Sequence, residues 1–287
     1  FFKQKTAYEM LRSLVGSEMC IRDRHIALQR AFGFPSPTYA HLPLIMDMKG
    51  RKLSKRDGDV EVHSFRRHGY LPEVMVNFIA LLGWSPGEDR EKMTLDEMVR
   101  LFSIERVGRT NAKFDREKLL AFNTDAIAAA SIPRLLEAFK DYISLNDTPF
   151  AGLDDAALTE LLRVNRGFRT FDDIVVKSGF LYRPDEAIVY EPDAVRNVLH
   201  KGDRAGVKML TTLLPRLEAQ EPWTAEALEA MLKAVCEELH VGMGKVAQPI
   251  RVAVSGGTIS PQIVETLVLL GKARTLARVR RCLAATT

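Results

Sequence analysis

A short basic loop near the start of the chain carries the residue types and spacing that most strongly suggest chemistry. Residues 50–59 hold four cations within six positions, and a hydroxyl lies among them: Arg51, Lys52, Ser54, Lys55 and Arg56. Glycines at the edges of the loop permit tight backbone turns. Ammonium groups act as point charges for phosphate oxygens, and a serine hydroxyl adds a donor. The loop is therefore a candidate polyphosphate site, with a solvated lysine-rich turn as the alternative.

The elements around this loop are a short strand before it and helices after it. Residues 42–46 form an apolar run of strand length, and residues 24–32 have a helical pattern. Pro72 opens a predicted helix that Gly83 ends, and Thr94 with Glu97 predicts a capping box. Further helices are predicted after Ser131 and at residues 154–164, 192–200, 206–218, 225–239, 261–270 (capped by Ser260) and 273–284. The pattern predicts a mixed α/β part up to about Val107, a linking segment at residues 114–123, and an all-helical remainder.

The composition is that of an ordinary globular protein. The chain has 287 residues, 46% hydrophobic and 27% charged, which suggests about two domains. No apolar run approaches the roughly 18 residues of a membrane span. Three scattered cysteines build neither a disulfide framework nor a zinc ribbon, and the histidines have no metal-ligand spacing. We therefore expect a cytoplasmic protein with no membrane contact and no protein-bound zinc.

Positive charge is concentrated in two places, although the net charge of +4 is mild. One run occupies residues 51–67. The other occupies residues 272–281 and contains no acid among its five cations, Lys272, Arg274, Arg278, Arg280 and Arg281. Each run predicts either a positive surface for a polyanion or an ordinary solvated helix face.

Several stretches of the chain resemble the glutamyl branch of the class I aminoacyl-tRNA synthetases. The run Lys52-Leu53-Ser54-Lys55-Arg56 is similar to the Lys-Met-Ser-Lys-Ser signature loop of that class. Residues 40–45, 69–73, 77–87 and 114–123 are similar to the sequences that surround the loop in the family. Residues 224–228, 244–254 and 269–272 are similar to its anticodon-binding portion. The resemblance covers residues 24–284 and implies a mostly α-helical fold, in which the C-terminal remnant of a Rossmann-type catalytic domain precedes an all-helical anticodon-binding domain.

The resemblance implies ATP-dependent activation of glutamate to an adenylate, followed by its transfer to tRNA(Glu). The second lysine of the loop, here Lys55, stabilises the phosphates during adenylate formation, with Lys52 and Ser54 supporting loop geometry and charge. The resemblance assigns ATP contacts to Leu44, Ile45, Lys55 and Arg56. ATP is the expected substrate, accompanied by Mg²⁺, and tRNA(Glu) and glutamate are the expected partners of a monomer.

Four residues match positions near the anticodon in this family: Arg166, Arg169, Arg251 and Ser260. The planar fork of an arginine can pair with a base edge and stack on the unstacked bases of an RNA loop. Surface salt bridging is the alternative for these arginines.

The chain departs from the family in two respects: Leu53 and Arg56 replace the Met and the last Ser of the signature loop, which is common in the glutamyl branch, and the chain contains no His-x-Gly-His motif. Residues 1–23 resemble a translated sequencing adapter, so we expect a foreign or unstructured leader there. Residues 24–130 are then the end of the catalytic domain, and residues 131–287 the anticodon-binding domain. We expect a fragment that is inactive alone, with a non-catalytic tRNA-binding helical module as the alternative. The paralogue that attaches glutamate to a modified tRNA base is disfavoured, because it lacks the helical C-terminal portion.

Overall fold

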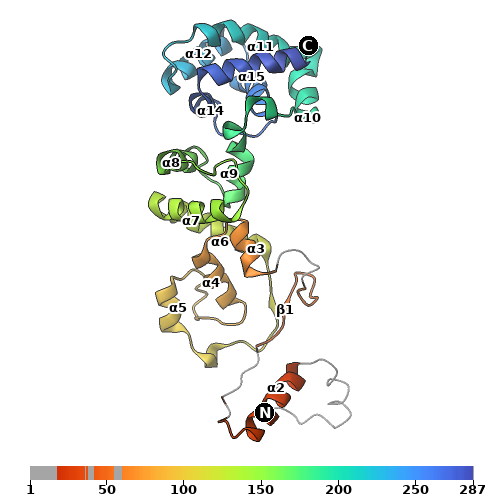
Figure 1. The fold of residues 1–287 in the computed structure, drawn as a ribbon, viewed down its shortest axis with the longest axis vertical. Coiled ribbons are helices and arrows are strands. Elements are labelled where there is room, and N and C mark those ends of the chain that lie inside the picture. The colour runs from red at the N-terminus through yellow and green to blue at the C-terminus, as the bar shows by residue number, and fades with distance from the viewer. Residues whose placement is uncertain (1–17, 36, 38–41, 55–59, 287) are drawn as a thin grey trace. The chain divides into compact units, whose positions relative to one another are not determined.

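The computed structural model describes residues 18–35, 37, 42–54 and 60–286, and the chain divides into two compact units, Phe1–Pro43 and Leu44–Thr287. The first unit contains helix α2, Glu18–Ala31 (Figure 1). This helix confirms the helical pattern of residues 24–32. It also runs across the expected leader boundary at residue 23, which stays a prediction.

The second unit begins with a small parallel sheet. Strand β1, Ile45–Met46, pairs with β2, Ala112–Lys113, with Ile45 opposite Ala112. The predicted strand is therefore present, but shorter than the apolar run. Helices α3 (Val62–Arg67), α4 (Pro72–Leu81), α5 (Leu95–Leu101) and the 3-10 turn η2 (Ile104–Arg106) lie between the two strands in the chain.

The helix starts in this part follow their capping residues. Thr94 and Glu97 form the predicted capping box at the start of α5. The linking segment predicted at residues 114–123 is mostly helical, because helix α6 spans Arg116–Ala129. Asp115 caps α6 by accepting a hydrogen bond from the Lys118 backbone N–H at 3.0 Å. That cap satisfies one of the free N–H groups of the first turn.

The middle of the unit is built from α7 (Ile132–Leu145), α8 (Asp155–Val164) and α9 (Phe171–Ser178), followed by the short turns η3 (Gly179–Tyr182) and η4 (Asp185–Ala187). Asp154 caps the predicted helix α8 by accepting a hydrogen bond from the Ala157 backbone N–H at 2.8 Å. Ser131 occupies the cap position of α7 without a side-chain capping bond. Stacked rings of Phe139 and Phe171, 5.2 Å apart, join α7 to α9.

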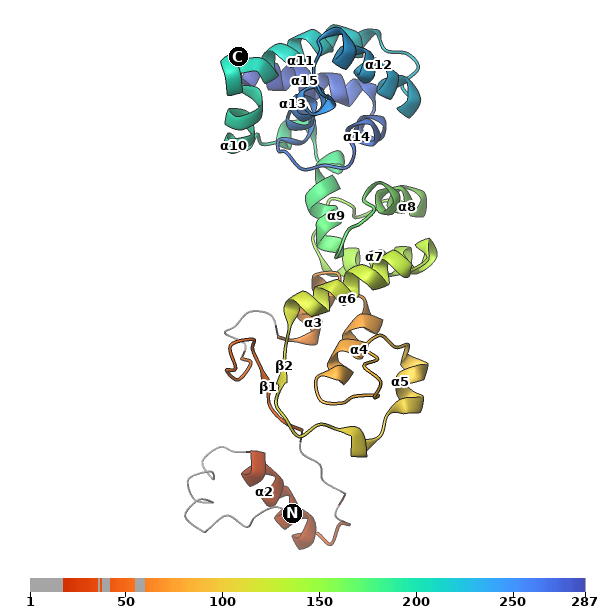
Figure 2. The ribbon, with the colours of Figure 1, turned by 180° about the vertical axis from the view of Figure 1, so that it is seen from behind.

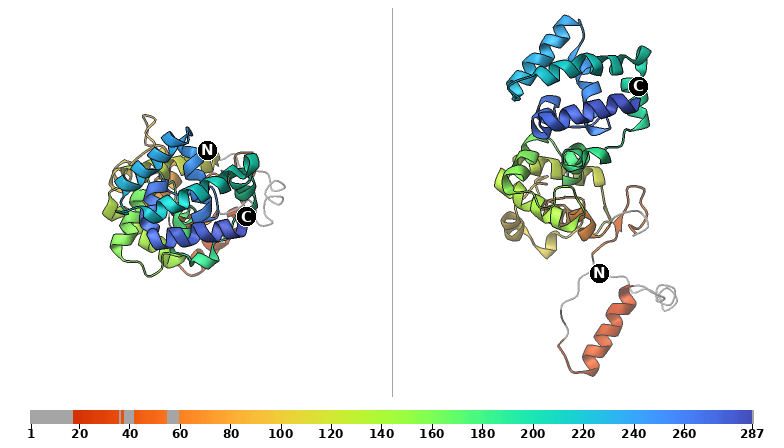
Figure 3. Two further views of the ribbon diagram at one scale, coloured as in Figure 1. Left: turned by 90° about the horizontal axis from the view of Figure 1, so that it is seen from above. Right: turned by 45° about the horizontal axis from the view of Figure 1, so that its top comes forward.

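The remaining elements are α10 (Pro192–Ala194), the π-helical η5 (Val195–Leu199), α11 (Lys201–Ala219), α12 (Ala225–Glu238), α13 (Met243–Ser255), α14 (Ile263–Leu270) and α15 (Lys272–Thr286). Helix α15 packs against α11 and α13 (Figures 2 and 3). Residues 192–200 form the α10–η5 segment, with a π-helical second half, where one regular helix was predicted. The predicted Ser260 cap is wrong, because Gln262 precedes α14 and Ser260 binds another helix.

A continuous cluster of buried side chains runs from Phe65 to Cys282. Asn123 on α6 is fully buried within it. Its side chain accepts from the Leu71 backbone N–H at 2.9 Å and donates to the Arg169 carbonyl at 2.5 Å. One amide thus ties the start of α4 to the turn before α9. The expected domain boundary at residues 130/131 falls between α6 and α7, and it stays a prediction.

Within the described part of the chain, no helix combines the length and apolar character needed to cross a membrane.

Candidate functional site

The first half of the basic loop is the return arm of a tight hairpin after β1. Asp47 closes the turn: its carboxylate accepts from the backbone N–H groups of Lys49 at 2.9 Å and Arg51 at 2.8 Å. The bond from the Arg51 N–H is the main reason that the pKa of Asp47 lies below its ordinary value. Gly50 has a φ of 78°, which suits glycine in such a turn.

The hairpin positions the signature-loop residues that are described. Lys52 lies opposite Met46 in an antiparallel bridge and is exposed, and the Leu53 N–H donates to the Ile45 carbonyl at 3.0 Å. Ser54 follows and is half-buried. Lys55 and Arg56, which carry the main ATP predictions, lie outside the described residues. The loop assignment therefore stays a prediction.

Two of the residues to which the resemblance assigns ATP contacts are open to solvent. Leu44 and Ile45 are 41% and 37% exposed. The Leu44 backbone N–H is already bonded to the Asn111 side chain at 3.1 Å, whereas the Ile45 carbonyl accepts from Leu53. A cavity of about 540 Å³ lies beside the hairpin, lined by Asp47, Arg51 and Leu53 and by residues 114–117. Neither Leu44 nor Ile45 lines it.

A second candidate region begins at the turn after α8. Arg166 is exposed, and buried Asn165 and Phe168 stand close on either side of it in the chain. The Asn165 amide donates to the Leu161 carbonyl and to the Ser178 hydroxyl, both at 2.8 Å. Gly167, with a φ of 81°, completes the turn. Arg166 is therefore presented to solvent from a rigid, anchored corner.

The fold brings Arg166 together with Ser260, although 94 residues separate them in the sequence. Both line a polar cavity of about 540 Å³, called the Arg166–Ser260 hollow, whose other lining residues include Arg163, Lys177, Gln262 and Glu265. Arg251 does not line the hollow itself, but its Nε donates a hydrogen bond to the Ser260 Oγ at 2.8 Å. Burial lowers the pKa of Arg251 from its ordinary value. The hollow thus presents cations and hydrogen-bonding groups that could contact RNA.

Arg169 is not part of this hollow. Its backbone N–H donates to the Asp173 carboxylate at 2.8 Å, and its guanidinium lies 3.7 Å from the same carboxylate. Of the four residues predicted to lie near the anticodon, three are therefore close together and Arg169 pairs with Asp173 instead. Lys177 and Gln262 also line the hollow and were not predicted as site residues. The only signal for them in the sequence is that they lie near Arg169 and Ser260.

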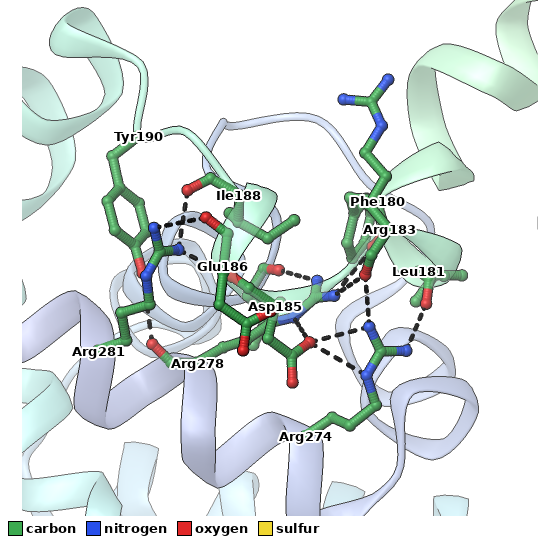
Figure 4. A network of polar contacts seen from close by, with 11 residues as sticks. Phe180, Leu181, Arg183, Asp185, Glu186, Ile188, Tyr190, Arg274, Arg278 and Arg281 are labelled. Carbon is green, nitrogen blue, oxygen red and sulfur yellow. Dashed lines mark hydrogen bonds and ion pairs between the residues drawn. The ribbon is translucent and has the colours of Figure 1, made fainter. Parts of the chain in front are cut away.

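The basic run at residues 272–281 does not form the free positive surface that the sequence offered as one interpretation (Figure 4). Arg274 and Arg278 both bind the Asp185 carboxylate, at 2.8 and 2.6 Å, and Arg278 is fully buried. Arg281 donates to the carbonyls of Asp185 and Ile188. The acids that neutralise the run lie far upstream in the sequence, so the local window could not show them. At the ends of the run, Lys272 pairs with Glu221 and Arg280 with Glu218, both at 2.7 Å.

Two protein families match the chain. Residues 134–283 match the anticodon binding domain family. Residues 11–121 match the catalytic domain of class I tRNA synthetases (E and Q). The second match starts inside the predicted leader.

The chain is also similar to individual proteins. Glutamate–tRNA ligase 1 of Alkalilimnicola ehrlichii is 38% identical over 257 residues, covering 90% of this chain and 53% of the relative. Glutamate–tRNA ligase of Thermus thermophilus is 35% identical over 262 residues, covering 91% and 54%. The chain thus spans about half the length of the curated relatives it matches. A crystal structure of a glutamate tRNA ligase from Elizabethkingia meningosepticum, in complex with its amino acid, superposes with a TM-score of 0.69 at 26% identity, over 97% of this chain and 56% of that one.

The match to the class I catalytic domain thus covers the hairpin, and the match to the anticodon binding domain covers the helices from α7 to α15. The chain belongs to the glutamate–tRNA ligase family of class I aminoacyl-tRNA synthetases.

Proposed function

We propose that this chain forms the signature-loop and anticodon-binding portions of an enzyme that attaches glutamate to tRNA(Glu) through a glutamyl-adenylate. ATP and glutamate are its substrates, Mg²⁺ accompanies ATP, and the enzyme works as a cytoplasmic monomer. The observation that carries the proposal is the Arg166–Ser260 hollow, in which two residues predicted to contact the anticodon meet from distant parts of the sequence.

The basic hairpin supplies the catalytic side of the proposal. Lys52 is held at the return arm of a turn that Asp47 and Arg51 fix. Lys55, three residues further along, is the proposed phosphate-stabilising cation. Preorganised cations next to a transferring phosphoryl group lower the barrier, because charge develops on the phosphate oxygens in the transition state.

The anticodon side is assigned residue by residue. Arg166 is exposed and is the proposed base-reading residue, and Arg251 positions the Ser260 hydroxyl. The guanidinium of Arg169 lies 3.7 Å from the Asp173 carboxylate, and this arrangement suits a phosphate contact rather than a base contact. A phosphate contact adds affinity for any tRNA, whereas a base contact distinguishes one anticodon from another.

A binding titration of the 287-residue chain tests this division. Its targets are tRNA(Glu) and the same tRNA with a swapped anticodon. Arg166→Ala should reduce the discrimination between the two by about 1–3 kcal/mol. Arg169→Ala should weaken both complexes alike and make binding less sensitive to salt. Arg196→Ala is the matched control, because Arg196 is 72% exposed and lies away from the hollow.

The outcomes separate the proposal from its alternative. The chain alone should bind tRNA but show no glutamate-dependent exchange of pyrophosphate into ATP, because it contains no His-x-Gly-His motif. If neither Arg166→Ala nor Arg251→Ala changes the ratio of the two affinities, anticodon reading by these residues is wrong. Equal binding to unrelated duplex RNA would leave only a non-specific helical module.

A further inference from the structure

A second cavity adjoins the Arg166–Ser260 hollow and has a different character. It has a volume of about 420 Å³ and is lined by Val175 and Val176 of α9, by residues around Arg183–Glu191, and by Ser255, Gly257 and Ile259. Three of its aliphatic side chains are unusually open: Val176 is 66% exposed, Val189 80% and Ile259 55%. We call this cavity the valine hollow. Exposed aliphatic side chains that gather at one cavity indicate an interaction site, whereas single exposed aliphatic side chains are common on any protein surface.

The two hollows are lined by neighbouring residues of two shared elements. Helix α9 supplies Val176 to the valine hollow and the next residue, Lys177, to the Arg166–Ser260 hollow. The loop between α13 and α14 supplies Ile259 to the first and Ser260 to the second. The two hollows therefore lie close enough together to contact neighbouring nucleotides of one RNA loop.

The wall of the valine hollow is held from behind by the arginines of α15. The Arg183 carbonyl accepts from Arg274 at 2.7 Å and from Arg278 at 3.0 Å. The Arg183 side chain points away from α15 (Figure 4), and no hydrogen bond or ion pair of its guanidinium is found among the described residues. The backbone of this wall is fixed while a cation on it is free to bind a ligand, which reduces the ordering cost of binding.

The opposite wall is equally constrained. The Glu191 backbone N–H donates to the Gly256 carbonyl at 2.8 Å. A side chain at position 256 would meet the Val189 carbonyl, since a Cβ there would lie 2.2 Å from that oxygen. Glu191 itself is exposed and lines the hollow, so its carboxylate can accept a hydrogen bond there. The hollow thus combines aliphatic walls with the guanidinium of Arg183 and the carboxylate of Glu191.

We propose that the valine hollow holds an unpaired nucleobase of the same tRNA loop that the Arg166–Ser260 hollow contacts. An unstacked base packs between apolar side chains, its amino or imino group can donate to a carboxylate, and a neighbouring phosphate attracts a guanidinium. The three requirements match the valines, Glu191 and Arg183 respectively. This inference rests on the proposed function, because it assigns a second base site to the same RNA.

The test measures binding of the full chain to the anticodon stem-loop of tRNA(Glu) and to a duplex of the same stem without a loop. The double substitution Val176→Ser with Val189→Ser should weaken stem-loop binding on the order of ten-fold, the effect expected for one packed base. Duplex binding should stay unchanged. Val99→Ser is the matched control, since Val99 is 71% exposed on α5. Both Val176 and Val189 are exposed, and a circular-dichroism melt checks that the variant folds.

Each alternative result has a distinct meaning. Unchanged stem-loop binding by the double variant, while Arg166→Ala still weakens it, overturns the valine hollow as a base site and leaves the proposed function intact. If the wild-type chain binds the stem-loop no better than the duplex, both the base site and the proposed function are wrong. If the wild-type chain sediments as a dimer, and the double variant as a monomer with unaltered RNA affinity, the hollow is a contact between two copies of this chain and the proposal is wrong.

Discussion

The hairpin at residues 45–53 and helix α15 both carry a run of cations, yet the fold uses the two runs in different ways. In the hairpin, Arg51 pairs with Asp47 only four residues away, and Lys52 is left exposed. In α15, Arg274 and Arg278 converge on Asp185, which is 89 and 93 residues distant in the sequence, and Arg278 is buried.

This difference shows that a local excess of charge does not by itself predict a positive surface. A cation run stays free only where the fold brings no distant acid against it. In α15 the guanidinium groups also satisfy backbone carbonyls of the η3–η4 segment, among them those of Phe180 and Leu181. A carbonyl buried without a donor is costly, so these bonds hold the segment in one conformation.

The largest expected effect breaks the α15 network. Asp185→Ala should lower the free energy of unfolding by about 3–5 kcal/mol, because it leaves the buried Arg278 charge without its partner. Chemical denaturation monitored by circular dichroism measures the change. Glu186→Ala is the control: the neighbouring carboxylate is exposed, and its loss should change stability by no more than about 0.5 kcal/mol. Equal effects of the two substitutions would contradict the role given to Asp185.

The hairpin should show the opposite behaviour, with a large effect on rate. In a full-length enzyme containing this chain, Lys55→Ala should slow glutamate-dependent exchange of pyrophosphate into ATP on the order of 100- to 1,000-fold, because a contact that stabilises transition-state charge is lost. The affinity for tRNA should hardly change. Lys49→Ala in the same turn is the control and should keep most of the exchange activity. An unaltered exchange rate for Lys55→Ala would remove the hairpin from the catalytic machinery.

A smaller effect should appear as pH falls. Burial works to raise the pKa of Asp185, but the hydrogen bonds from Arg278 and Arg274 outweigh it and hold that pKa below its ordinary value of 3.8. A carboxyl whose pKa is lowered in the folded state stabilises the fold above its unfolded pKa, and this contribution is lost as pH falls through the folded pKa. Stability should therefore fall with acidification below about pH 4.

Other carboxylates titrate in the same range, among them Asp141, whose pKa the hydrogen bond from Arg66 lowers. The informative quantity is therefore the difference between the wild-type chain and Asp185→Asn. That difference should be large at neutral pH and should shrink towards pH 2. A constant difference across the range would mean that the ionised form of Asp185 contributes nothing.

Features set by neighbouring residues were predictable from the sequence. The capping box at Thr94, the Asp154 cap and the strand at Ile45 all depend on a few adjacent side chains. Helix α13 was not predicted, because Pro249 interrupts its pattern, although this proline is accommodated inside the helix and buried there. Helix α6 was not predicted as a helix, because its place in the fold depends on tertiary contacts such as those of Asn123 with Leu71 and Arg169.

The candidate site divides in the same way. Its catalytic side could be predicted from one contiguous run of residues, the signature loop, and that assignment stays a prediction. Its anticodon side was predicted residue by residue and also stays a prediction, and the sequence could not show that Arg166 and Ser260 line one cavity or that Arg169 lies beside Asp173. Such meetings depend on how α8, α9 and the α13–α14 loop pack, and no local pattern carries that information.

The smallest expected effect completes the contrast between the two cation runs. Lys52→Ala should leave the free energy of unfolding within about 0.5 kcal/mol of wild type, because the residue is exposed and its place in the hairpin depends on its backbone opposite Met46. Chemical denaturation of the Lys52→Ala and Asp185→Ala variants in one experiment compares the smallest and the largest expected changes in the free energy of unfolding. A loss of 2 kcal/mol or more, on the order of a lost core contact, would mean that Lys52 is bound into the fold as the α15 arginines are. In that case the hairpin would be a structural element, and its cations would not be available to ATP.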